Sequence, residues 1–142
     1  MRALLDVNVL VALLDADHVL HPAALVWFTA NAKPGWASCP ITQNGCIRIM
    51  SHPGYPGHAS ARVVADRLAG ATSHEVHEFW PDDVSLLTDD LLDLDRVHGP
   101  RQITDLYLLA LAVRRGGRLV TFDRAIDLAA VKGAGPRHLL RL

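Results

Sequence analysis

The chain has 142 residues, about the length of one domain, and 50% of them are apolar, which is enough to fill a core without a disulfide or a metal. Its net charge of −1 excludes a protein that binds nucleic acid through a strongly basic surface. The two cysteines, Cys39 and Cys46, form no CxxC pair, so we expect small buried residues in a reduced cytoplasm and not a zinc knuckle. We expect residues 1–142 to form a single domain.

The start of the chain is apolar but lacks the features of a signal peptide. Asp6, Asn8 and Asp15 interrupt the apolar run, and no cleavage site of the A-x-A type follows. No stretch reaches the ~18 uninterrupted apolar residues of a membrane-spanning helix. We therefore expect a cytoplasmic protein without a membrane segment.

The first half of the chain alternates short apolar runs with segments of helical periodicity. His21-Pro22 and Pro40 suit helix starts, and the Pro- and Gly-rich segment 51–57 predicts an exposed loop. We predict strands at 2–6 and 36–39, and helices at 9–14, 23–31, 42–50 and 59–70.

The second half contains the clearest helix, at residues 101–115. Its apolar residues recur at i, i+3, i+4 and i+7 from Leu106, Pro100 precedes it, and two glycines follow it. We also predict strands at 75–80, 118–122 and 138–140, and helices at 86–94 and 125–131. The alternation of strands and helices predicts a three-layer α/β fold with a mainly parallel central sheet flanked by helices.

Three aspartates stand at the ends of these predicted elements. Asp6 and Asp123 each follow an apolar strand, and Asp105 lies at the start of the clearest helix. Ligands of parallel α/β sheets bind outside the carboxyl ends of the strands, so we expect the three carboxylates to share one crevice. Clustered carboxylates raise one another's pKa unless a cation balances them, and Mg²⁺ prefers such oxygen ligands. This pattern favours metal-dependent phosphodiester chemistry.

Three segments together resemble the motifs of PIN-domain ribonucleases, specifically the VapC toxins of bacterial toxin–antitoxin pairs. They are residues 5–12 (LDVNVLVA), 104–112 (TDLYLLALA) and 121–124 (TFDR), and the resemblance covers essentially the whole chain. It implies a parallel sheet with helices on both sides and cleavage of RNA that depends on Mg²⁺ or Mn²⁺. It also implies a cognate VapB-type antitoxin and a homodimer.

The resemblance assigns roles residue by residue. Asp6, Asp105 and Asp123 match the acids that bind metal and carry catalysis, and Thr121 matches a position where a hydroxyl supports the late aspartate. Asn8 lies two residues past Asp6, where it would orient a carboxylate or a water; a helix N-cap is the alternative role for Asn8.

The chain departs from the family pattern at the glutamate of the third helix. Segment 42–48 contains no carboxylate, and a register fixed on Arg48 puts Gly45 in the glutamate's place. Gln43 and Asn44 would offer amide oxygens there; ordinary polarity of a helix start is the alternative. With one negative charge fewer, we expect weaker metal binding, with one metal, or a second that arrives with the RNA phosphate.

Arginines near the motifs are candidates for contacts with RNA phosphates, because the planar guanidinium binds two oxygens at once. They are Arg48, Arg114, Arg115 and Arg124; a solvated surface is the alternative explanation for each.

Three functional hypotheses follow from the sequence. The first is an endoribonuclease toxin silenced by an antitoxin, and the second is a catalytically weak or inactive PIN-like module that binds RNA or a protein partner. The third, a receiver domain or aspartate-nucleophile phosphatase, fits poorly because Asn8 stands where the phosphatase needs a second acid and Lys132 does not end a strand.

Overall fold

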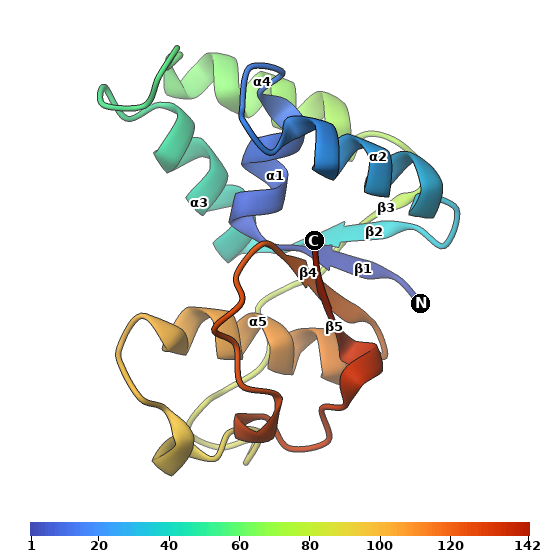
Figure 1. Ribbon diagram of the computed structural model, residues 1–142, viewed down its shortest axis with the longest axis vertical. Helices are drawn as coiled ribbons and strands as arrows, with labels where there is room; N and C mark the ends of the chain where they lie inside the picture. Colours follow the sequence, from blue (N-terminus) through green and yellow to red (C-terminus); the bar gives the residue numbers. More distant parts are fainter.

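A computed structural model describes residues 1–142 and contains one five-stranded sheet in the order β3-β2-β1-β4-β5 (Figure 1). All four pairs of neighbouring strands are parallel. The strands are β1 (Ala3–Leu5), β2 (Trp36–Ser38), β3 (His77–Phe79), β4 (Arg118–Thr121) and β5 (Leu139–Arg141). The helices are α1 (Val7–Leu14), α2 (His21–Asn31), α3 (Pro40–Met50), α4 (Ala61–Thr72) and α5 (Gln102–Arg114), with 3₁₀ turns η1 (Leu94–Arg96), η2 (Leu128–Ala130) and η3 (Pro136–His138).

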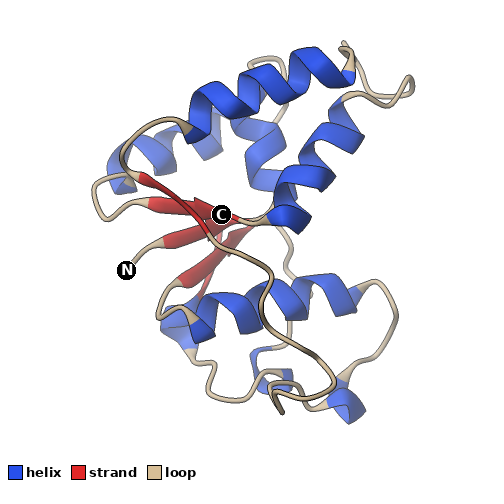
Figure 2. Ribbon diagram, turned by 180° about the vertical axis from the view of Figure 1, so that it is seen from behind, coloured by secondary structure: helices blue, strands red, loops and turns tan.

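Helices cover both faces of the sheet, with α1 to α4 on one side and α5 on the other (Figures 1 and 2). Side chains alternate between the two faces along each strand. Leu4 and Leu119 belong to the core on the α5 side, whereas Leu5 and Val120 belong to the core that α1, α3 and α4 complete. Both faces are buried only at the centre of the sheet, where β1 is a continuous apolar run and β4 is buried from Leu119 to Thr121. The edge strand β3 is polar and partly exposed. The predicted three-layer α/β fold is confirmed.

Helix α5 is buried more completely than its predicted apolar stripe requires. All seven residues from 106 to 112 are buried. The sheet covers one side of α5, and side chains that include Trp80, Val84, Ile126 and Val131 belong to the same core. A helix that is covered all round is apolar all round, which explains the run LYLLALA. None of the helices is both long and apolar enough to cross a bilayer.

Two predicted helices are wrong, and aspartate side chains explain both. Residues 86–94 form turns and one antiparallel bridge, because the Asp89 carboxylate accepts the Ser85 N–H at 2.6 Å. Residues 125–131 contain only the η2 turn, where Asp127 accepts the Ala129 N–H at 2.9 Å. Short polar side chains that bond the backbone locally compete with helix formation.

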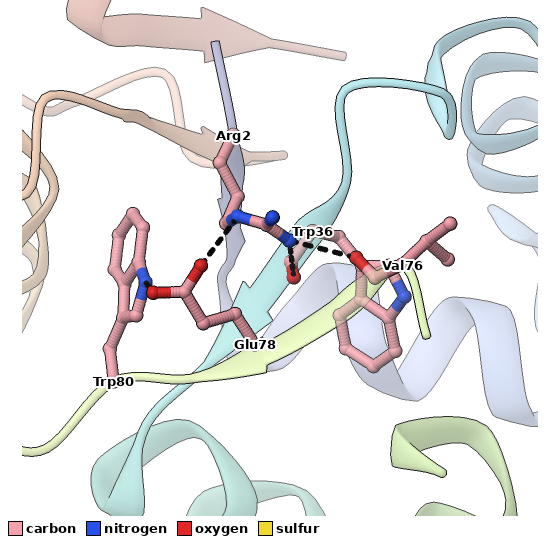
Figure 3. Close-up of polar contacts among 5 residues, drawn as sticks. All are labelled: Arg2, Trp36, Val76, Glu78 and Trp80. Atoms are coloured by element: carbon pink, nitrogen blue, oxygen red, sulfur yellow. Dashed lines mark hydrogen bonds and ion pairs between the residues drawn. The ribbon is translucent and has the colours of Figure 1, made fainter. Parts of the chain in front are cut away.

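A hydrogen-bonded network closes the edge of the sheet at which β1 and β2 begin (Figure 3). The Arg2 guanidinium donates to the Val76 carbonyl at 2.9 Å and forms an ion pair with Glu78 at 2.8 Å. Glu78 also accepts the indole N–H of Trp80 at 3.1 Å. Gly35 lies directly under the guanidinium with φ +86°, so an added Cβ would overlap Arg2.

We predict that Gly35→Ala destabilises the protein clearly more than Gly57→Ala. Both glycines have positive φ, which disfavours alanine by roughly 1–2 kcal/mol, but a Cβ at position 57 meets nothing within 4 Å. Alanine at position 35 would also displace the Arg2 guanidinium and break its charged hydrogen bond to the Val76 carbonyl, a further ~1.5–3 kcal/mol. Urea unfolding of the two variants measures the difference, and equal losses would contradict a structural role for the Arg2 network.

Candidate active site

The predicted site lies where the direction of the chain across the sheet reverses. From β1 the chain moves to β2 and β3 on one side, and β4 then pairs with the opposite edge of β1. In parallel α/β sheets this point opens a crevice at the carboxyl ends of the two central strands. Asp6 directly follows β1, and Thr121 ends β4.

The hydroxyl group of Thr121 connects three of the predicted site residues. It donates to the Asp6 carboxylate at 2.6 Å and accepts the Asn8 side-chain amide at 3.2 Å and the Asp123 backbone N–H at 2.9 Å. A hydroxyl has one hydrogen to donate and two lone pairs to accept with, so Thr121 is saturated. Its side chain is fully buried, which excludes water as a competing partner.

Asp6 and Asn8 both join the first turn of α1 to this arrangement. The second oxygen of Asp6 accepts the Val7 N–H at 2.7 Å, so Asp6 is the N-cap of α1 as well as a buried acid. Asn8 lies inside the helix and is not its cap; its oxygen accepts the Phe122 N–H at 3.2 Å. The helix that follows β1 is thereby attached to the residues that follow β4.

Asp105 completes the acidic group from the first turn of α5. The pKa of Asp105 is raised to about 7, mainly by burial and in addition by the charges of Asp6 and Asp123. Burial also raises the pKa of Asp6 against the opposing effect of the Thr121 hydrogen bond, with a smaller contribution from Asp123. The fold therefore brings the three acids within range of one another's charge.

The donors at this edge are of the kind that suits a hard divalent cation. They are carboxylates. Burial and, to a smaller extent, charge repulsion raise the pKa values of Asp6 and Asp105, and a bound cation would relieve that repulsion. No group of three or more His, Cys, Asp or Glu side chains is already arranged as a metal centre. The three acids are thus close enough for their charges to interact, but they are not arranged as a complete set of metal ligands.

Close packing of α3 against α1 explains why position 45 has no side chain. Gly45 is buried, and a Cβ there would lie 2.7 Å from the Cγ2 atom of Val7. Val7 is the residue directly after Asp6. A glutamate at position 45 would therefore require the Val7 side chain to move.

The two amides of the same helix have different surroundings. Gln43 donates to the buried Ser38 hydroxyl at 2.9 Å, and that hydroxyl lies 2.8 Å from the His77 ring. These partners belong to β2 and β3, on the side of β1 opposite to β4. Asn44 is exposed. Neither amide has a contact with the group formed around Thr121.

The predicted RNA-contacting arginines fall into two groups. Arg114 pairs with Asp89 and Arg115 with Asp83, and both lie at the end of α5 remote from the site. Arg114 is nine residues past Asp105, or about 13 Å along the helix axis at ~1.5 Å per residue. In contrast, Arg48 and Arg124 are exposed without an ion pair, and Arg124 is adjacent to Asp123 in the chain.

The structure also shows one arginine near the site that sequence patterns did not indicate. Arg141 of β5 donates to the backbone carbonyl of Ile126, in the loop that follows Asp123. No local motif marks this residue. Only the pairing of β5 with β4 would have indicated that it lies at this edge of the sheet.

Comparison with known proteins agrees with this geometry. The family model of the PIN domain matches residues 3–132. The chain belongs to the PIN-domain family.

Ribonuclease VapC44 of Mycobacterium tuberculosis (strain ATCC 25618 / H37Rv) is 55% identical over 142 residues, which is 100% of both chains. Ribonuclease VapC39 of the same strain is 48% identical, covering 94% of this chain and 96% of the relative. The resemblance predicted from the three motifs is confirmed.

Two solved structures share the fold at low sequence identity. VapC20 of Mycobacterium tuberculosis, described as a Sarcin-Ricin loop cleaving toxin, has a TM-score of 0.60 at 14% identity and covers 94% of this chain and 99% of its own. A chain of VapBC2 from Rickettsia felis, bound to a DNA fragment from their promoter, has a TM-score of 0.63 at 15% identity and covers 100% of this chain and 99% of its own. PIN-domain membership removes the receiver and phosphatase alternatives.

We predict that Asp105 makes the metal-free protein less stable as the pH rises. The folded-state pKa of about 7 lies above the ordinary value of 3.8, so the folded protein binds this proton more tightly than the unfolded chain. This stabilisation is complete below about pH 4 and is lost as the pH rises through 7. Urea unfolding in EDTA should therefore show that Asp105→Asn gains more stability over wild type at pH 8 than at pH 4.5. An equal difference at both pH values would contradict the assignment.

Proposed function

We propose that this protein is a metal-dependent endoribonuclease of the toxin type, which cleaves RNA phosphodiester bonds and is neutralised by a VapB-type antitoxin. The observation that carries the proposal is the arrangement of Asp6, Asn8 and Asp123 around the Thr121 hydroxyl, with Asp105 within range of their charge. The 55% identity to a ribonuclease VapC over the full chain supports the same activity. A homodimer and a cytoplasmic location are part of the same proposal.

Asp6, Asp105 and Asp123 would hold Mg²⁺, or Mn²⁺ in its place. When bound, such a cation supplies a water of lowered pKa and offsets negative charge on the phosphate. Since that water needs no separate histidine base, the absence of a histidine from the group around Thr121 is consistent with the proposal. Asp105 also lies at the positive end of the α5 dipole, worth ~0.3–1 kcal/mol to its charged form.

The remaining residues would orient these acids and the RNA. Thr121 fixes one oxygen of Asp6 and the backbone of Asp123, and Asn8 fixes the chain at Phe122. Partners of this kind typically change metal affinity ~10–100-fold when they are removed. Arg48 and Arg124, both exposed and without an ion pair, would contact RNA phosphates.

The missing glutamate limits the number of cations that the protein holds alone. Gly45 packs on Val7 and offers no ligand, and Gln43 is bound to Ser38. Three carboxylates suit one resident cation, and a second would enter only with an RNA phosphate as an additional ligand.

The alternative function is a catalytically weak or inactive PIN-like module that binds RNA or a protein partner. Gly45 is the observation that favours it, since one acid of the family pattern is absent and the Val7 side chain packs where its Cβ would lie. Retention of Asp6 and Asp123 close enough to raise the pKa of Asp105 by their charges favours the nuclease.

We predict that Mg²⁺ or Mn²⁺ with purified, antitoxin-free protein cuts total bacterial RNA into discrete fragments, and that EDTA abolishes the cleavage. Asp6→Asn should reduce the rate by more than the ~10–100-fold expected for loss of a supporting partner, because it removes a ligand charge. Asp66→Asn is the matched control, since Asp66 is an exposed acid of α4. Sequencing the fragment ends would identify the target.

Two outcomes would contradict this proposal. Folded wild-type protein that cuts no RNA with either metal would favour the binding module. Cleavage that persists in EDTA, or in Asp6→Asn at the wild-type rate, would show that the nuclease does not use this site.

A further inference from the structure

Asp123 lies in a loop without regular secondary structure, between the end of β4 and the η2 turn. Contacts already described hold the first part of this loop. Asn8 accepts the Phe122 N–H, and Thr121 accepts the Asp123 N–H. The Asp123 carboxylate then accepts the Ala125 N–H at 2.7 Å, which folds the loop around its own acid.

Arg141 of β5 and Leu142, the residue directly after β5, hold the two ends of the same loop. The Leu142 N–H donates to the Thr121 carbonyl at 2.9 Å, directly before Phe122. The Arg141 guanidinium donates to the Ile126 carbonyl at 2.7 Å, three residues past Asp123. Residues 121 to 126 are therefore held at each end by the two adjacent residues Arg141 and Leu142.

The direction of the Arg141 side chain follows from the alternation along β5. Leu139 and Arg141 point to the same face, and Leu139 belongs to the core on the α5 side. Ile126 belongs to that core too and is 4% exposed. The guanidinium thus meets the loop where the loop is already buried.

Arg141 has no acidic partner that would explain its position otherwise. It forms no ion pair, and its one side-chain hydrogen bond is to the Ile126 carbonyl. A charged donor to a carbonyl makes a stronger hydrogen bond than a neutral donor. The contact is therefore suited to holding the far end of the loop at Ile126.

We propose that Arg141 is a positioning residue for Asp123. Its guanidinium binds the Ile126 carbonyl and so holds the loop. This keeps the Asp123 carboxylate near Asp6 and Asp105, at the carboxyl ends of β1 and β4. The inference rests on the proposed function, in which Asp123 binds the metal.

The test compares Arg141→Ala and Arg141→Lys with wild type, and Arg62→Ala serves as the control because the Arg62 side chain is 85% exposed in α4. The first readout is amide hydrogen exchange at Asp123 and Ala125 in metal-free protein. We expect about tenfold faster exchange in Arg141→Ala, with the amides of β1 unchanged, because only the loop opens. Arg62→Ala should match wild type.

The second readout is the affinity for Mn²⁺, measured by electron paramagnetic resonance without RNA. We expect a loss of about tenfold in Arg141→Ala, at the low end of the effect of outer partners on metal sites, and partial recovery in Arg141→Lys. RNA cleavage should fall at low Mn²⁺ and recover at saturating Mn²⁺.

The possible failures are distinguishable. Wild-type exchange and Mn²⁺ affinity in Arg141→Ala would overturn the role of Arg141 alone. Faster exchange throughout the protein would also overturn it, because Arg141 would then support global stability and not the loop. A wild-type protein that binds no Mn²⁺ would overturn the metal site itself and, with it, any positioning of a ligand.

Discussion

The hydroxyl group of Thr121 is the point on which the site depends. Through its single hydrogen and two lone pairs, this buried group joins an acid that follows β1, an amide in α1 and the loop that follows β4. Asp6 and Asn8 lie 115 and 113 residues before Thr121 in the chain. Parallel pairing of β1 with β4 is what brings them together. Without the hydroxyl, the buried Asp6 carboxylate would keep only the donors that the first turn of α1 supplies.

Because the fold brings the acids of the site close together, their negative charges repel one another. Burial and neighbouring charges raise the pKa of Asp105 to about 7, so part of the site is protonated at neutral pH until a cation enters. This couples metal binding to proton release. On the opposite edge, the Arg2 network and the pairs formed by Arg114 and Arg115 balance their charges within the protein. In contrast, Asp6, Asp105 and Asp123 form no ion pair at the carboxyl ends of the strands, where a cation and RNA would bind.

Local sequence patterns predicted the features that depend on residues close together in the chain. Strand 2–6, helix 101–115 and the parallel sheet follow from apolar periodicity, and the position of Asp6 after a strand indicated its edge of the sheet. The predicted helix at 86–94 failed because Asp89 bonds the backbone of Ser85. Contacts between distant segments could not be predicted from such patterns. The packing of Val7 against Gly45 and the hydrogen bond from Arg141 to the Ile126 carbonyl exist only once the strands are ordered.

The most direct test of this account is Mn²⁺ binding to metal-free wild-type, Thr121→Val and Thr121→Ser proteins, without RNA. Valine keeps the shape of threonine and removes the hydroxyl, and serine returns it. We predict that wild type and Thr121→Ser bind Mn²⁺ similarly and that Thr121→Val binds at least about tenfold more weakly. Equal affinity in all three folded proteins would show that the Thr121 hydroxyl does not organise the site, and no binding by wild type would show that the three acids do not form a metal site.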